Sequence, residues 1–460
     1  MKQALDTRTK LLTKNPWPLM IELSIPAVLG MVVVGLYNMM DSIFVGQMVG
    51  DVQMGAISVS YPLTLINAGS AAMLGVGSAS VLSRAIGKKD ENTIKKIMGN
   101  LVAMVLLLSV IYTVVGMVFT RQLLSLTGAS DNILNYAEKY LRIVFAGSLF
   151  VNFFQSANMV IRGEGQLKKA MTIIASGAIL NIILDPIFIF VLHMGIRGAA
   201  LATILSQLLS AIWILRFLTS DKTILKLRRS SMRLSAQRVR KIVGLGLSGF
   251  TMSITNCTVQ IMCNATLQVY GGDLYVGVMT VINSIREIAT LPVTGVTHSA
   301  QPVLGFNYGA KEYGRVKKAI VFTSFIAILY TTGIWLIVDG FPAFFIRIFN
   351  QDAELIAAGI PAIRLYFFGF FMMSLQFSGQ SIFVGLGKSK KAIFFSIFRK
   401  VIIVVPLTIL LPGMFGMGTN GVFAAEPISN FVGGIACFGT MLLTIWRELT
   451  RLQKGKDSYR

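Results

Sequence analysis

Five carboxylic side chains stand inside long apolar segments of this 460-residue chain: Glu22, Asp41, Asp185, Glu287 and Glu426. A carboxylate at the centre of a membrane-spanning helix costs a few kcal/mol, so such residues usually bind an ion, relay a proton or contact a substrate. Glu22 follows Pro18 closely, near the expected end of its helix, and we expect it to stay in reach of water. The other four are candidate site residues.

Two of these acids have a polar companion one helical turn earlier. Tyr37 precedes Asp41 by four residues, and Asn181 precedes Asp185 by the same spacing, so each pair shares a helix face. The next apolar segment repeats the spacing with small residues, which allow close helix approach and supply a hydroxyl. We therefore predict one oxygen-lined pocket formed by Tyr37, Asp41, Asn181, Asp185, Ala199 and Thr203.

Such a pocket suits either a proton or Na⁺. Two carboxylates buried close together do not both stay ionised easily, so one of them is expected to exchange a proton near neutral pH. Hard oxygen ligands suit a small hard cation equally well, as in Ca²⁺ and Mg²⁺ sites. The residues leave both ions open, and also the alternative that the acids only hydrogen-bond the helices together. The Na⁺ ligands would be Asp41, Asn181, Asp185 and Thr203.

Two prolines stand beside this pocket in the sequence. Pro26 lies in the first apolar segment, and Pro186 directly follows Asp185. Proline removes a backbone donor and bends helices, which leaves carbonyl groups available. We expect Pro26 and Pro186 to be points of helix bending.

The composition requires a membrane. Hydrophobic residues make up 54% of the chain and charged residues only 13%, with a mean hydropathy of +0.70. A soluble domain would carry roughly twice that charged fraction. Apolar runs such as 97–119, 171–192 and 319–338 approach the ~20 residues that span a bilayer as a helix. We expect an all-α polytopic membrane protein with twelve transmembrane helices.

The net charge of +22 is a topology signal. Most of the Lys and Arg residues fall in alternate loops and in both terminal segments, which by the positive-inside rule face the cytoplasm. We therefore expect a multi-pass protein of the cytoplasmic membrane with both termini in the cytoplasm. Anionic lipid headgroups are expected contacts of these loops, whereas nucleic acid is not an expected partner.

The chain repeats itself at an offset of 222 residues. Gly50-Asp51 recurs as Gly272-Asp273, and Lys95-Lys96 recurs as Lys317-Lys318. This repeat predicts two homologous six-helix bundles. Because six is even, the bundles enter from the same side, and carriers of this design have a pseudo-two-fold axis along the membrane normal. The expected parts are a cytoplasmic N-terminus (1–16), an N-lobe (17–218), a basic cytoplasmic linker (219–241), a C-lobe (242–446) and a cytoplasmic tail (447–460).

The repeat also provides an internal comparison. Asp41 corresponds to Cys263 and Asp185 to Leu407, so the second bundle lacks the acidic pair. It has other charged residues instead, for which a structural ion pair and a contact with a substrate cation both stay open. The candidate residues of a substrate cavity are Asn38, Gln260, Arg286, Glu287 and Glu426.

Four segments together resemble a bacterial multidrug and toxic compound extrusion (MATE) transporter, over about residues 15–446. They are SIPAVLGMVVVGLYNMMDSIFVGQ, NIILDPIFIF, GIRGAALATILSQ and QPVLGFNYGAK. The resemblance implies a cation-coupled antiporter that expels amphipathic, often cationic organic compounds through a V-shaped cleft. It also implies a cation site at the six N-lobe residues above. Some members have an essential acid in the tenth span, and the corresponding segment here, FFGFFMMSLQFSGQSIFVGLG, contains none.

The sequence therefore predicts a monomeric secondary active multidrug antiporter with rocker-switch alternating access, driven by H⁺ or Na⁺ and without a cofactor. The alternative within transport is a flippase for a lipid-linked precursor. That alternative predicts several basic residues facing a pyrophosphate, whereas Arg286 is the only basic residue that we place well inside a span. An enzyme is not expected, because no nucleophile–base pair or metal-ligand cluster stands in the sequence.

Overall fold

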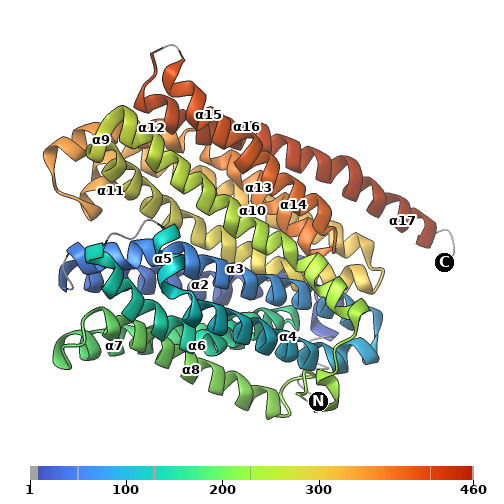
Figure 1. Cartoon of the computed structure of the whole chain (residues 1–460). Helices are drawn as coiled ribbons and strands as arrows, with labels where there is room; N and C mark the ends of the chain where they lie inside the picture. Colours follow the sequence, from blue (N-terminus) through green and yellow to red (C-terminus); the bar gives the residue numbers. More distant parts are fainter. Residues whose placement is uncertain (1–8, 49–50, 128–130, 228, 415, 458–460) are drawn as a thin grey trace. The chain divides into compact units, whose positions relative to one another are not determined.

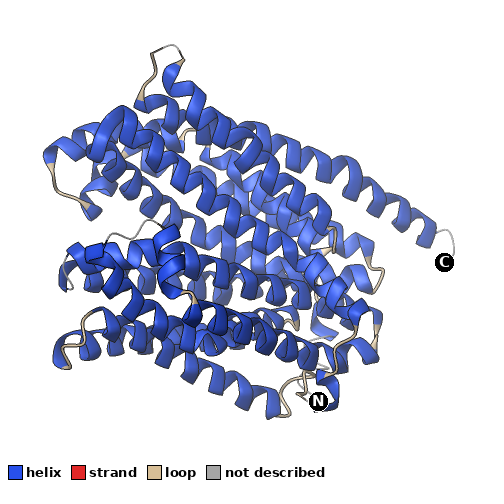
Figure 2. Ribbon diagram, viewed as in Figure 1, coloured by secondary structure: helices blue, strands red, loops and turns tan. Residues whose placement is uncertain are grey.

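The computed structural model describes residues 9–48, 51–127, 131–227, 229–414 and 416–457. It describes side chains throughout these ranges except at 38–48, 51–55, 58, 131–132, 229 and 456–457. The predicted site residues Asn38 and Asp41 therefore lie outside the described side chains. All regular elements in the described ranges are helical (Figures 1 and 2), which confirms the all-α class.

From residue 16 onward, the first half of the chain forms eight helical elements, labelled as in Figure 1. They are α2 (Pro16–Met48), α3 (Asp51–Lys88), α4 (Glu91–Val118), α5 (Thr120–Leu126), α6 (Asp131–Gly163), α7 (Leu167–Pro186), the π-helical η1 (Ile187–Val191) and α8 (Ile196–Thr219). A short 3₁₀ element, η2 (Arg229–Met232), lies in the basic linker.

The second half begins within one long element, α9 (Ala236–Gly309). The rest are α10 (Tyr313–Gly340), α11 (Pro342–Phe349), α12 (Ala353–Phe367), α13 (Phe370–Gly385), α14 (Ser389–Ile397), η3 (Phe398–Val404), α15 (Val405–Leu410), η4 (Leu411–Gly413), α16 (Thr419–Thr440), η5 (Met441–Trp446) and α17 (Arg447–Asp457).

The predicted number of spans is confirmed. Ten helical segments of the described chain are long and apolar enough to cross a membrane, and α12 with α13 makes one further span, bent by 46°. One of the ten is α9, whose 74 residues are interrupted at Gly272 by a non-helical conformation (φ 63°, ψ −162°). Glycine adopts a positive φ at little cost, so α9 is two spans joined at Gly272, and the total is twelve.

The chain forms two compact units. Unit 1 comprises Met1–Lys14 and Leu29–Phe250, and unit 2 comprises Asn15–Val28 and Thr251–Arg460. Helix α2 therefore contributes its first part to unit 2 and the remainder to unit 1. The boundary falls two residues after Pro26.

Buried polar side chains link the helices of unit 1. The Asn152 side chain on α6 donates to Asn67 Oδ1 on α3 and to Ser109 Oγ on α4, both over 3.0 Å. Ser156 Oγ donates to the Ala71 carbonyl over 2.9 Å. Between apolar helices in a bilayer, such bonds and close packing replace the hydrophobic effect as the forces of association.

Two glycines let α3 and the first part of α9 touch through their backbones. A Cβ at Gly246 would lie 1.7 Å from the Met73 carbonyl oxygen, and one at Gly77 would lie 2.0 Å from the Ile242 carbonyl oxygen. No side chain fits at either position unless the helices separate. Gly244, two residues before Gly246, faces open space.

The linker after α8 is fastened to unit 1 by Glu164, in the turn between α6 and α7. This carboxylate is 3% exposed and accepts from Thr223 Oγ1 over 2.8 and 2.9 Å and from the Ile224 backbone N–H over 2.8 Å. Burial raises the pKa of the Glu164 carboxyl to about 7, and the hydrogen bonds oppose that rise only in part.

Substitution of Gly246 by Ala should destabilise unit 1. Overpacking against a backbone carbonyl costs about 1–3 kcal/mol, so the apparent melting temperature of the purified protein should fall by several degrees. The matched control is Gly244→Ala, which adds the same methyl group in open space and should leave the temperature unchanged or raise it. Equal melting temperatures for Gly246→Ala and wild type would contradict the close backbone contact.

The Glu164 carboxyl should make stability depend on pH. Its folded pKa of about 7 exceeds the ordinary 4.5, so the folded state holds the extra proton between these values and stability falls as pH rises through them. The Glu164→Gln protein cannot ionise at this position. Its free energy of unfolding should therefore rise relative to that of wild type by up to about 3 kcal/mol between pH 4.5 and pH 7. Melting temperatures measured across this pH range test the prediction, with Glu91→Gln at an exposed carboxylate as control. The same pH dependence of the melting temperature in Glu164→Gln and wild type would refute it.

Candidate functional site

Two residues of the predicted cation site lie together on α7, and a third meets them from α8. Asp185 is fully buried and Asn181 is 1% exposed. In one orientation of the Asn181 amide, its nitrogen lies 3.5 Å from Asp185 Oδ1. With the amide turned over, its nitrogen donates to Asp185 Oδ2 over 2.8 Å and its oxygen accepts from the Thr203 backbone N–H over 3.1 Å. The second orientation satisfies both ends of the amide and links Asp185 to α8 through Asn181.

Small residues bring α7 and α8 close enough for this contact. A Cβ at Gly177 would lie 2.4 Å from Ser210 Oγ, and one at Gly198 would lie 2.8 Å from the Phe188 carbonyl oxygen. Ala199 is buried one turn before Thr203 on α8, which is half-buried. The structure therefore brings Asn181, Asp185 and the Ala199–Thr203 face of α8 to one place.

Pro186 changes the helix directly after the acid. Helix α7 ends at Pro186, and η1 continues as a π-helix in which the Leu192 N–H donates to the Ile187 carbonyl over 3.0 Å. Since proline has no N–H, the carbonyl one turn before it loses its usual helical donor. Local widening of this kind often occurs at functional sites in helices.

Helix α2 packs against α7 through Gly30, where a Cβ would lie 2.5 Å from Met171 Sδ. Tyr37 is half-buried two turns after Gly30, so it lies on the same face of α2. The helix continues through Pro26 with helical backbone, and the predicted bend there stays a prediction. Among the described side chains, no group of three His, Cys, Asp or Glu residues gathers as a metal cluster.

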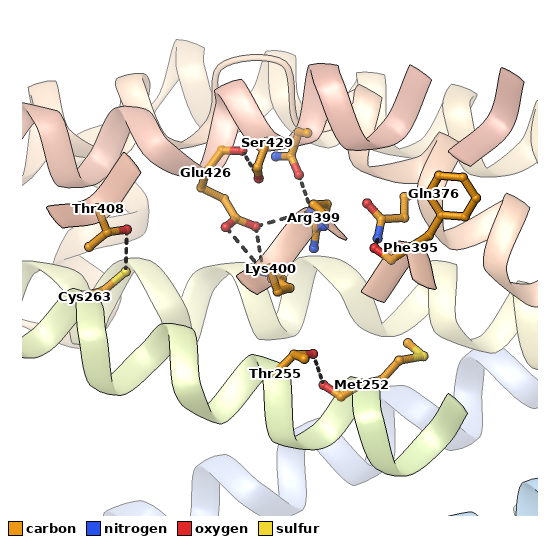
Figure 3. A network of polar contacts seen from close by, with 11 residues as sticks. Met252, Thr255, Cys263, Gln376, Phe395, Arg399, Lys400, Thr408, Glu426 and Ser429 are labelled. Atoms are coloured by element: carbon orange, nitrogen blue, oxygen red, sulfur yellow. Dashed lines mark hydrogen bonds and ion pairs between the residues drawn. The ribbon is translucent and has the colours of Figure 1, made fainter. Parts of the chain in front are cut away.

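Unit 2 has a different buried polar group, centred on Glu426 of α16 (Figure 3). Lys400 Nζ lies 3.1 and 3.3 Å from the two oxygens of Glu426, and Arg399 Nη1 lies 3.5 Å from Oε1. Arg399 also donates to Asn430 Oδ1. Each of these side chains is almost completely buried, so Glu426 is held in an ion pair inside the unit.

Arg399 and Lys400 are functional candidates that sequence reasoning missed. The argument from loop charge counts them with the basic segment around Lys390 as part of a cytoplasmic loop, yet they lie within the apolar span Ser389–Gly413. The expectation that Arg286 is the only basic residue well inside a span is therefore wrong. The seven residues AIFFSIF before Arg399 were the available signal, because two helical turns carry the chain well past a membrane surface.

A small cavity of about 20 Å³ opens beside this ion pair. Predicted cavity residues Gln260, Arg286 and Glu426 line it, together with Tyr366 and Lys400. Glu287 is exposed on α9 and is not among its lining residues. The structure thus places three of the predicted residues at one cavity, but Glu287 outside it.

The charged groups of the two units differ in sign. Unit 1 buries Asp185 beside the Asn181 amide, whereas unit 2 buries more cations than anions around its cavity. Twelve spans with buried ionisable residues define a polytopic membrane transporter.

The MatE family model matches residues 26–187 and again residues 248–410, which together cover more than half of the chain. The chain therefore belongs to the MatE (MATE) family of transporters and is not an enzyme. The two matches begin 222 residues apart, in agreement with the repeat in the sequence.

Among named relatives, "Multidrug export protein MepA" of Staphylococcus saprophyticus is 23% identical over 407 residues, 86% of this chain and 88% of that protein. The protein of the same name from Staphylococcus aureus strain MSSA476 is 22% identical over 403 residues, 86% and 88% of the two chains. A solved structure of a multidrug resistance MATE family transporter of the MOP superfamily, in an outward-facing conformation, superimposes with a TM-score of 0.91 at 26% identity. The superposition covers 97% of this chain and 98% of the chain in that structure.

Neutralising Glu426 should destabilise unit 2 severely. Removing one partner of a buried ion pair leaves the other charge uncompensated, at a cost of about 3–5 kcal/mol. Glu426→Gln should therefore reduce the yield of folded protein and lower its melting temperature, measured by gel filtration and thermal unfolding in detergent. Glu354→Gln, which neutralises an exposed carboxylate of the same unit, is the matched control and should behave as wild type. A Glu426→Gln protein as stable as wild type would show that the ion pair does not contribute to the stability of the protein.

Proposed function

We propose that this protein is a secondary active antiporter that exports amphipathic, often cationic organic compounds in exchange for H⁺ or Na⁺. The observation that carries this proposal is the buried Asp185 and Asn181 pair facing Thr203 in unit 1. An acid without access to water binds a proton or a small cation when one reaches it, because either neutralises the charge. The second bundle has leucine at the matching position, so the fold does not require the acid.

Asp41 completes the proposed site. Tyr37 precedes it by one turn on α2, and α2 packs against α7 at Gly30. Proton or Na⁺ binding at Asp41 and Asp185, with Asn181 and Thr203 as neutral ligands, would neutralise a charge at the contact between these helices. Differential binding of this kind shifts the population between two conformations.

Helix α2 is the proposed coupling element. Its first part belongs to unit 2 and its remainder to unit 1, with the boundary two residues after Pro26. Bending near Pro26 would therefore change how the two bundles move during alternating access, and the π-helix after Pro186 supplies a second adaptable segment. Related transporters have been solved as a "straight" and a "bent" conformation, with TM-scores of 0.91 and 0.88 to this chain.

The relatives support the substrate class. The MepA proteins are named multidrug export proteins, and their matches cover 86% of this chain. With the basic loops on the cytoplasmic side, export across the cytoplasmic membrane by a monomer with both termini inside the cell is the arrangement that we propose.

Replacing either acid should abolish coupled transport. Ethidium, an amphipathic cation, should accumulate in inverted vesicles when a Na⁺ or an H⁺ gradient is imposed, and Asp41→Asn or Asp185→Asn should reduce the accumulation more than tenfold. The amide cannot release a proton and holds a cation weakly, so the gradient no longer acts on the site. Imposing the two gradients separately identifies the ion.

Asp221→Asn, the same chemical change at an exposed residue of unit 1, is the matched control and should transport as wild type. Gel filtration of each variant shows whether it has folded. A folded Asp41→Asn or Asp185→Asn protein with undiminished accumulation would overturn the coupling role, and the absence of gradient-dependent movement by wild type would overturn export of this cation.

A further inference from the structure

The cavity of unit 2 is lined by a cation, Arg286, that forms no ion pair with any residue in the described part of the chain. Arg286 lies on α9, and its Nε is shielded from solvent without a hydrogen-bond partner among the described residues. A guanidinium donor that is shielded from water without a partner is costly, because nothing replaces the water that it has lost.

The neighbouring charges do not remove this excess. Both oxygens of Glu426 face Lys400, and Arg399 takes a position beside the same carboxylate (Figure 3). Arg286, Arg399 and Lys400 therefore surround a single buried carboxylate. Even when the exposed Glu287 next to Arg286 is counted, cations outnumber anions.

The other lining groups add hydrogen-bond capacity around Arg286. Amide side chains of Asn256, Gln260 and Asn283 line the cavity, and so does Tyr366. Each can donate to an oxygen atom, and an arginine fork matches the two oxygens of a carboxylate. Asn256 and Gln260 are exposed, whereas Tyr366 is buried, so the cavity has an accessible and an inner side.

We propose that this cavity binds the carboxylate group of a small organic anion or zwitterion, with Arg286 as the principal partner. The cavity holds little more than one water molecule, so only the carboxylate enters and the apolar body of the ligand stays at the exposed side. An excess of one or two positive charges suits a monoanion better than a pyrophosphate.

This site goes beyond the proposed export of cations, because carboxylate binding in unit 2 does not depend on ion binding at Asp41. It would admit zwitterionic compounds, whose cationic and anionic ends need different partners.

Equilibrium binding of 1-naphthoate to the full chain in neutral-lipid nanodiscs tests the proposal, with uncharged 1-naphthamide as the comparison ligand. Wild type should bind 1-naphthoate at least tenfold more tightly than 1-naphthamide. Arg286→Gln should weaken 1-naphthoate binding at least tenfold and leave 1-naphthamide binding unchanged. The affinity of Arg286→Lys for 1-naphthoate should lie between those of wild type and Arg286→Gln. The matched control Arg347→Gln, at an exposed arginine of unit 2, should bind as wild type.

Three results would overturn the proposal: equal affinity of wild type for the two naphthyl ligands, undiminished 1-naphthoate binding by Arg286→Gln, or tighter Arg286-dependent binding of inorganic pyrophosphate. The last would favour a phosphorylated ligand. The Asp41→Asn protein should bind 1-naphthoate as wild type does, so failure of export and failure of this site are distinguishable.

Discussion

The structure depends on the cost of placing polar and charged groups where water cannot solvate them. Helices satisfy the backbone, but every buried side chain with a donor or acceptor must find its partner in the protein. The N–H₂ group of Asn152 does so by joining α6 to α3 and α4, and Asn181 does so by joining Asp185 to α8. Where this requirement is met incompletely inside a cavity, as at Arg286 Nε, a ligand can supply the missing partner.

The two units meet this requirement in opposite ways. Unit 1 buries an acid, Asp185, beside the Asn181 amide, and we propose that a proton or Na⁺ completes this site. Unit 2 pairs its acid, Glu426, with lysine and arginine, and leaves Arg286 in excess. A duplicated fold has thus acquired different electrostatics in its halves, because the helix packing depends on small and apolar residues and tolerates exchange of the polar ones.

Much of the fold was predictable because a bilayer imposes length and apolarity on every span. The twelve spans and the repeat followed from these constraints, and the spacing of Asn181 and Asp185 placed them on one helix face. The burial of Arg399 and Lys400 was not predicted, because charged residues in a sequence normally indicate a loop. A buried basic pair needs an acid from another helix, here Glu426, and the sequence does not show that contact. The position of Glu287 outside the cavity also could not be predicted from the sequence. Arg286 and Glu287 are adjacent on a helix and point in different directions, and only the packed structure shows which of them faces the cavity.

The sequence by itself determined the class of protein, the duplication and the acids of the first half, because hydropathy, loop charge and helical period are local properties. The tertiary structure alone decided which partners those residues meet. It joined Asn181 to the Thr203 backbone, divided α2 between the units beside Pro26, and paired Glu426 with a lysine 26 residues earlier in the chain. Electrostatic energy depends on distance in space rather than along the chain, and only the packed helices fix those distances.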